Sequence, residues 1–174
     1  AGAPLYLGRA LFRDVTERQE RKRELERQED RFQYVEAVAD IGYWEIDALS
    51  PPPHEFELSD GIYPILGLEP GDSVGLESGL ERYHPDDRGM VQADLEGAIS
   101  RGESFEHEAR FTDATGEERW VHSVGEPIEA DGEIVSVRGA LQDVTDRKRQ
   151  AQALSRQNDR LAEFASVVSH DLRN

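Results

Sequence analysis

The fold is decided by residues 105–147, which read FEHEARFTDATGEERWVHSVGEPIEADGEIVSVRGALQDVTDR. Residues 105–112 alternate apolar and charged positions, which is the pattern of a half-buried β-strand. A second strand is expected over residues 119–127. The Asp131-Gly132 pair predicts a tight hairpin before a third strand over residues 134–141. These segments predict an antiparallel sheet.

The sequence upstream adds two shorter strands and several helices. A strand is expected over residues 41–48, and the three prolines at 51–53 end it because proline cannot continue a ladder of hydrogen bonds. A second strand begins near residues 55–58, a compact helical turn follows at 61–67, and a longer helix is expected over about 88–100. The predicted order β-β-α-α-β-β-β indicates an α+β fold.

A short repeat predicts the organisation of the chain. The pentapeptide DVTER at residues 14–18 returns as DVTDR at residues 143–147, and a charged helix is expected after each copy. We therefore expect a segment of a longer protein with four parts. These are the tail of a preceding unit at 1–14, a linker helix at 15–37, a central domain at 38–146, and an exit helix that opens a further domain at 147–174.

Both charged helices have large apolar residues at the spacing of a coiled coil. The apolar positions are seven and then three residues apart, with polar residues between them. This pattern predicts a parallel homodimer seam; the alternative is a single amphipathic helix that lies on its own domain. The seam residues are Leu25, Phe32 and Val35 in the first helix, and Leu154, Leu161 and Phe164 in the second.

The composition excludes several classes of function. With 20 Lys+Arg against 37 Asp+Glu, the net charge of −17 argues against a nucleic-acid partner. The sequence has no cysteine, which excludes disulfides, thiolate metal sites and a thiol-attached flavin. No apolar run is long enough for a membrane span and no leader is visible, so we expect no membrane contact and a cytoplasmic location.

The acidity is spread along the chain, and the only lysines are Lys22 and Lys148. An acidic surface that is poor in lysine is typical of proteins from salt-loving microbes, where concentrated salt screens the repulsion between carboxylates. The alternative is an acidic domain without this adaptation.

Five pieces of the sequence resemble a PAS domain of the PAC-containing type. They are Ile41–Glu45, Ile65–Gly67, His84–Arg88, Arg119–Val121 and Asp143–Arg147. The resemblance covers about residues 32–147, and residues 5–18 resemble the last strand of an earlier PAS unit. It implies a five-stranded antiparallel sheet in spatial order 2-1-5-4-3, with short helices on one face and helices at both ends. Such domains are sensory and dimerisation modules.

The resemblance also implies that the domain holds haem, a flavin, an organic acid or nothing. Haem needs an axial ligand that faces the pocket, and the available residues do not suggest one, so we expect neither haem nor a metal. The residues considered are His54, His84, His107, His122 and Met90.

A small organic ligand would need an apolar cleft, and six residues are candidates to line it. Arg110 or Arg119 could then pair with a carboxylate of the ligand. The alternative, which we favour, is that the aromatic residues form the core and that both arginines occupy exposed strand positions. No cofactor is evident. The six candidates are Trp44, Ile46, Phe56, Phe105, Phe111 and Trp120.

The C-terminal residues 164–174, FASVVSHDLRN, resemble the phosphoacceptor box of sensor histidine kinases. The resemblance implies that His170 accepts a phosphoryl group, that Asp171 takes a proton from its ring, and that Asn174 and Arg173 help to position the group. The alternative is an incidental exposed histidine. The implied partners are an ATP-binding kinase domain and a response regulator, and we expect no catalysis by this chain alone.

Together these features predict a sensory PAS module of a two-component histidine kinase, which passes signals through its flanking helices. Two alternatives stay open. One is an interaction and dimerisation module of a non-kinase transducer or transcription regulator, and the other is a receptor domain for a small ligand.

Overall fold

A computed structural model describes the backbone of residues 4–171 and the side chains of residues 18–164. The chain divides into two compact units, residues 1–39 and residues 40–174. The elements, in chain order, are α1 (Pro4–Ala39), β1 (Ile41–Asp47), β2 (Glu55–Leu58), α2 (Ile62–Leu66), β3 (Val74–Gly75), α3 (Leu76–Glu81), α4 (Pro85–Arg101), β4 (Phe105–Thr112), β5 (Glu118–Ala130), β6 (Glu133–Asp143) and α5 (Thr145–Asp171).

The first unit is the single helix α1, which has 36 residues. The prediction that residues 5–18 form the closing strand of an earlier unit is therefore wrong, because these residues belong to a helix. A strand must pair its N–H and C=O groups with another strand, whereas a helix satisfies them within the segment, and the Glu-, Arg- and Gln-rich sequence that follows favours helix. The assignment of residues 1–14 to a preceding unit stays a prediction.

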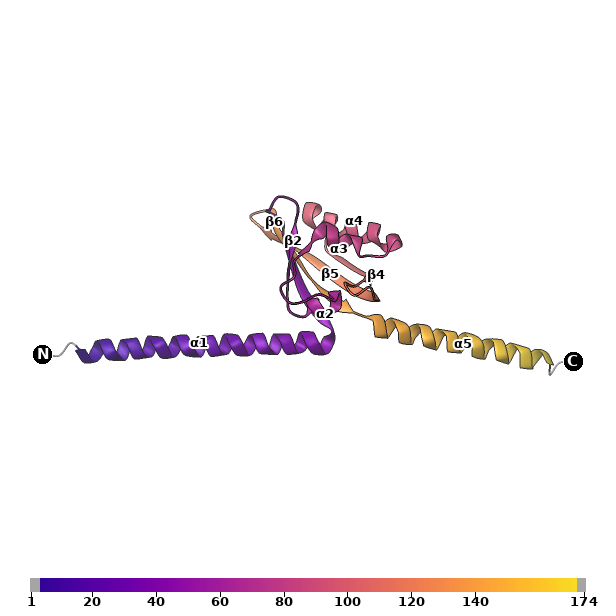
Figure 1. The fold of residues 1–174 in the computed structure, drawn as a ribbon, viewed down its shortest axis with the longest axis horizontal. Helices are drawn as coiled ribbons and strands as arrows, with labels where there is room; N and C mark the ends of the chain where they lie inside the picture. The colour runs from indigo at the N-terminus through magenta and orange to yellow at the C-terminus, as the bar shows by residue number, and fades with distance from the viewer. Residues whose placement is uncertain (1–3, 172–174) are drawn as a thin grey trace. The chain divides into compact units, whose positions relative to one another are not determined.

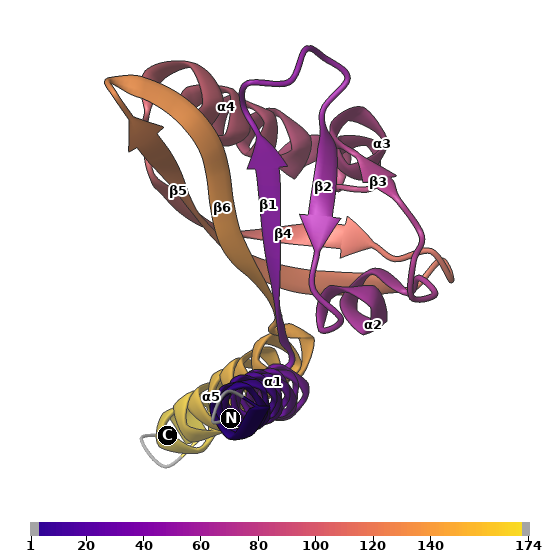
Figure 2. The ribbon, with the colours of Figure 1, turned by 90° about the vertical axis from the view of Figure 1, so that its left-hand side faces the viewer.

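The second unit contains one antiparallel sheet with the strand order β3-β2-β1-β6-β5-β4 (Figure 2). The five predicted strands occur in the predicted spatial order, but the sheet has six strands. The extra strand, β3, consists of Val74 and Gly75, which pair with Phe56 and Glu55 at the edge of the sheet. Two residues are too few to show an alternation in the sequence, so this strand was missed.

Helices α3 and α4 lie on the same side of the sheet (Figure 1, Figure 2). The core lies between the inner face of the sheet and the buried residues of α2 and α4. In β4 the alternation is as predicted, because His107, Ala109 and Phe111 are buried and Glu106 is exposed. The fully buried side chains of the core include Ile46, Ile62, Val91, Val121 and Val137.

Two of the predicted turns are confirmed. Gly67 ends α2 in the left-handed conformation with φ 67°, which glycine adopts without steric cost. Asp131 and Gly132 both have positive φ, 52° and 83°, as a two-residue hairpin of type I′ requires.

The seam residues that the structure describes are exposed. Leu25, Phe32, Val35, Leu154, Leu161 and Phe164 are between 52% and 68% exposed. The alternative interpretation required the apolar residues of α5 to pack on their own domain. They do not, because Leu154, Leu161 and Phe164 are exposed. None of the helices in the described part of the chain is apolar enough along its length to cross a membrane.

Candidate functional site

A cavity of about 70 Å³ lies between the inner face of the sheet and helices α2–α4. Four of the six predicted pocket residues, Trp44, Phe56, Phe105 and Phe111, line it. Ile46 is fully buried in the core but does not line the cavity.

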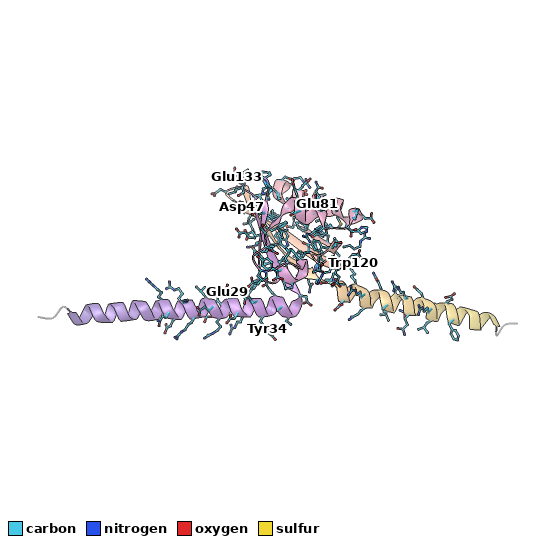
Figure 3. The ribbon with its side chains drawn as sticks, viewed as in Figure 1. Glu29, Tyr34, Asp47, Glu81, Trp120 and Glu133 are labelled. Atoms are coloured by element: carbon cyan, nitrogen blue, oxygen red, sulfur yellow. The ribbon has the colours of Figure 1, made fainter. Side chains whose placement is uncertain are left out.

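Trp120 does not line this cavity, and its prediction as a pocket residue is wrong. Neighbouring residues of a strand point to opposite faces of the sheet, so Val121 is buried on the inner face and Trp120 lies on the outer face. There the ring is 5.9 Å from the Arg110 guanidinium carbon and 4.7 Å from the Lys148 ammonium. Figure 3 shows Trp120 beside the start of α5.

Aromatic rings are stacked along one wall of the cavity. The Trp44 and Phe105 centroids are 6.1 Å apart with a 14° angle between the rings, and Phe105 stacks on His107 at 5.2 Å and 9°. Two glycines make this possible. A Cβ on Gly125 would overlap the Phe105 ring, and one on Gly139 would lie 2.5 Å from the Trp44 ring. Both strand glycines are sequence signals for a close approach of this kind.

His107 is a buried polar group of the cavity, and its environment could not be predicted from its position in the strand. The residue is 8% exposed, and its ring lines the cavity with Nδ1 at 2.6 Å from Asp94 Oδ2. Nε2 is buried and has no hydrogen-bond partner among the described residues. Tyr83 also lines the cavity, and burial raises the pKa of its hydroxyl to about 12. No spacing in the sequence identifies Asp94 as the partner of His107.

The other four haem-ligand candidates do not line the cavity. His84 accepts a hydrogen bond from the Asp86 N–H at 3.2 Å and so caps the N-terminus of α4. His122 pairs with Glu106 at 2.9 Å on the outer face, and Met90 is exposed. Within the described residues, no three His, Asp or Glu side chains lie close enough together to hold a metal ion.

The two arginines proposed as carboxylate ligands are paired with protein carboxylates. Arg110 donates to both oxygens of Asp87, at 2.8 and 2.7 Å, and Arg119 donates to Asp113 at 2.8 Å and Asp143 at 2.9 Å. Hydrogen bonding to Arg110 lowers the pKa of Asp87 to about 2. Neither arginine lines the cavity, but both are half-buried and not at the exposed positions that the alternative expected.

The start of α5 is held by a group of four residues, Asp113, Arg119, Asp143 and Thr145, which we name the helix junction. Asp143 accepts hydrogen bonds from the N–H and the hydroxyl of Thr145, and the Trp120 N–H donates to the Thr145 hydroxyl at 3.0 Å. Arg119 joins Asp143 to Asp113. The junction therefore connects the turn after β4, the strands β5 and β6, and the first residue of α5.

A second contact holds the first turn of α5 on the outer face of the sheet. Glu108 of β4 pairs with both Arg147 and Lys148. The hydrogen bond from Lys148 lowers the pKa of the Glu108 carboxyl. Since Lys148 also lies over the Trp120 ring, the sheet and the helix are linked through two strands.

The predicted phosphoacceptor residues lie at the far end of α5. His170 and Asp171 are in the last turn of this helix, and their side chains lie outside the described residues. Arg173 and Asn174 lie outside the described residues altogether.

Comparisons with known proteins agree with this architecture. A blue-light-activated histidine kinase of Brucella anthropi is 29% identical over 126 residues, which cover 72% of this chain and 25% of that kinase. The chain thus spans about a quarter of this curated relative.

Two solved structures are also similar. A sensory box histidine kinase/response regulator from Burkholderia thailandensis has a TM-score of 0.59 and 31% identity, over 76% of this chain and 98% of that one. A domain assigned to a light and redox sensing histidine kinase from Haloarcula marismortui has a TM-score of 0.52 and 30% identity, over 67% of this chain and 99% of that one.

The profile of the PAS fold matches residues 55–141, from β2 to β6. This match spans half of the chain and contains strands β2–β5, most of β6, helices α2–α4 and every described cavity-lining residue except Trp44. The chain belongs to the PAS fold family.

Proposed function

We propose that this chain is the sensory PAS module of a cytoplasmic two-component histidine kinase, and that it passes changes in the PAS core through α5 to the phosphoacceptor His170. The observation that carries the proposal is the continuity of α5. This helix begins in the helix junction at Thr145 and runs without a break to Asp171, so one rigid element joins the sheet to the Ser-His-Asp segment. The relatives that are histidine kinases support the same reading.

The helix junction supplies a physical route for the signal. A shift of β5 or β6 moves Trp120 and Asp143, and both hold Thr145 at the start of α5. The contact of Glu108 with Lys148 adds a second point of attachment on β4. Because a helix transmits rotation or translation along its axis, a displacement at Thr145 reaches the turn of His170.

The seam supplies the dimer that such a relay requires. Leu154 and Leu161 are exposed and one heptad apart, and Phe164 follows three residues later. In a parallel dimer these residues would pack against their copies and bring two His170 helices side by side. The net charge of −17 per chain opposes this association unless salt screens it.

The chemistry proposed for His170 is that of a histidine nucleophile. A ring nitrogen attacks the γ-phosphorus of ATP held by a kinase domain, the N–P bond forms, and ADP leaves. Asp171 accepts the proton from the other ring nitrogen, which orients the attacking one. Asn174 is four residues further on, on the same face of a helix as His170.

A flavin that reacts through a cysteine thiol does not fit this chain. The sequence has no cysteine, and the cavity is lined chiefly by apolar side chains, with His107 and Ser123 as the polar groups on the sheet. Tyr83 and Arg82 also line the cavity, but none of these side chains can form the adduct that a thiol forms. We therefore derive no photochemical step for this chain.

The test is phosphorylation of the chain by an ATP-binding histidine kinase domain that is supplied with labelled ATP. We expect phosphate that is labile in acid and stable in base, and we expect His170→Gln to abolish it. His122→Gln is the matched control and should leave the label unchanged, since His122 lies on the sheet. Label that persists in His170→Gln would show that another residue is the acceptor.

A further inference from the structure

One buried polar atom of the cavity is left without a partner. The His107 side chain is 5% exposed, its Nδ1 pairs with Asp94, and its Nε2 has no hydrogen-bond partner in the part of the chain that the structure describes. A buried polar group without a partner is rare in folded proteins because it loses its hydrogen bonds to water. A bound molecule that uses Nε2 would remove this cost.

Asp94 determines what kind of hydrogen bond Nε2 can make. A carboxylate oxygen only accepts, so the 2.6 Å contact places a proton on Nδ1. In the neutral ring, Nε2 then carries a lone pair and acts as an acceptor. A complementary ligand therefore brings a hydroxyl or an N–H donor.

The surroundings of His107 indicate the rest of the ligand. The ring is covered on one side by Phe105, which in turn stacks on Trp44, so this wall of the cavity is flat and aromatic. Ser123 lies opposite His107 on β5 and also lines the cavity. Most of the described lining residues are apolar, none is acidic, and Arg82 adds one cationic group. The space of about 70 Å³ is well above the roughly 10–15 Å³ that a single water needs.

We infer that the cavity binds a small uncharged molecule with one apolar ring and one donor group, and that the donor bonds to His107 Nε2. This inference rests on the proposed sensory function and names the ligand class of that site. An anionic ligand is disfavoured because the chain carries a net charge of −17 and the lining is mostly apolar, with Arg82 as the one permanently charged residue among the described lining residues.

The experiment compares three probes on the complete chain, namely phenol, toluene and benzoate. Binding is measured by calorimetry and by the shift in melting temperature, at pH 8, where free histidine is neutral. Phenol should bind roughly tenfold more tightly than toluene, which has the same ring size but no donor. His107→Phe should reduce phenol to the affinity of toluene and leave toluene unchanged. Equal affinities in the wild type, tightest binding of benzoate, or no binding at all would overturn the inference.

A second variant tests the role of Asp94 without removing the ring. In Asp94→Asn the amide N–H can donate to Nδ1 of His107, so the ring proton moves to Nε2. Nε2 then donates, and the cavity should prefer a ligand with an acceptor group, such as benzaldehyde, over phenol. Asp86→Asn, on the exposed side of the same helix, is the control and should keep the preference for phenol. An unchanged preference in Asp94→Asn would contradict the inference, even if His107→Phe failed to fold.

The two proposals fail independently. Phosphorylation of His170 is measured without any probe, so a loss of ligand preference would leave the kinase relay standing. Loss of phosphorylation would in turn leave the calorimetric result valid for the cavity.

Discussion

At the scale of the residue, the buried carboxylate Asp113 shows how this acidic chain stabilises a charge in its interior. Asp113 is 3% exposed, and burial by itself raises the pKa of its carboxyl. Hydrogen bonds from Thr115, Glu117 and Arg119 outweigh this effect and lower the pKa to about 2. The carboxylate is therefore ionised in the folded protein at all but very acidic pH, and it anchors the helix junction through Arg119.

This shift predicts how stability depends on pH. The pKa of about 2 in the folded state is below the ordinary value of 3.8, so the ionised group stabilises the fold above about pH 4. The contribution, about 2 kcal/mol by linkage, is lost as the pH falls from about 4 to 2. Urea unfolding at pH 6 and pH 3 should show this loss in the wild type and a smaller one in Asp113→Asn.

The matched control is Asp131→Asn, because Asp131 lies in the exposed hairpin turn and asparagine tolerates its positive φ. It should leave the pH dependence of unfolding unchanged. The role assigned to Asp113 is wrong if Asp113→Asn and the wild type lose the same free energy between pH 6 and pH 3.

At the scale of the element, the strands β5 and β6 have glycines where large rings cross them. Gly139 of β6 lies against Trp44, and Gly125 of β5 lies against Phe105. The two glycines face each other in the ladder between these strands. The aromatic wall of the cavity thus depends on the absence of two side chains.

Gly139→Ala should destabilise the domain by roughly 3 kcal/mol, because the new methyl group would overlap the Trp44 ring and the backbone of β5. Chemical denaturation measures this directly. Gly89→Ala is the control, since Gly89 lies in α4 with no atom near its Cβ position, and this change should be neutral or stabilise by up to about 1 kcal/mol. Similar stabilities of the two variants would contradict the packing described here.

At the scale of the whole molecule, the negative net charge of each chain opposes the predicted association of two chains. Each chain carries −17, and the exposed seam residues of α1 and α5 offer an apolar surface for a second copy. The predicted adaptation to high salt and the predicted homodimer are linked, because screening by salt weakens the repulsion between two such chains.

The prediction is that the chain forms a dimer in 2 M KCl, with twice the mass of the 19.6 kDa chain in light scattering. The double variant Leu154→Glu, Leu161→Glu should be monomeric, because it places like charges along the seam. Gln152→Glu, on the opposite side of α5, should remain a dimer. A wild-type chain that is monomeric at tens of micromolar in this salt would refute the seam.

Much of the fold could be predicted from the sequence because it depends on neighbouring residues. The alternation of His107, Ala109 and Phe111 identified the inner face of β4, and the hairpin at Asp131 and Gly132 followed from turn chemistry. The alternation along β5 places Trp120 on the outer face, next to the inward-facing Val121, which the prediction of a pocket position for Trp120 did not take into account. The two-residue strand β3 could not be predicted, because its pairing with β2 is not visible in its own sequence.

The order of the strands along the chain, the buried face of β4 and the position of the exit helix followed from the sequence alone, since these depend on local alternation and turn residues. Only the tertiary structure decided which charged groups meet. Asp94 and His107 are 13 positions apart, Asp87 and Arg110 are 23 apart, and Arg119 and Asp143 are 24 apart. Their pairing follows from how α4 packs on the sheet and how β5 lies beside β6, because spacing along a chain does not specify which distant side chain an ion will face.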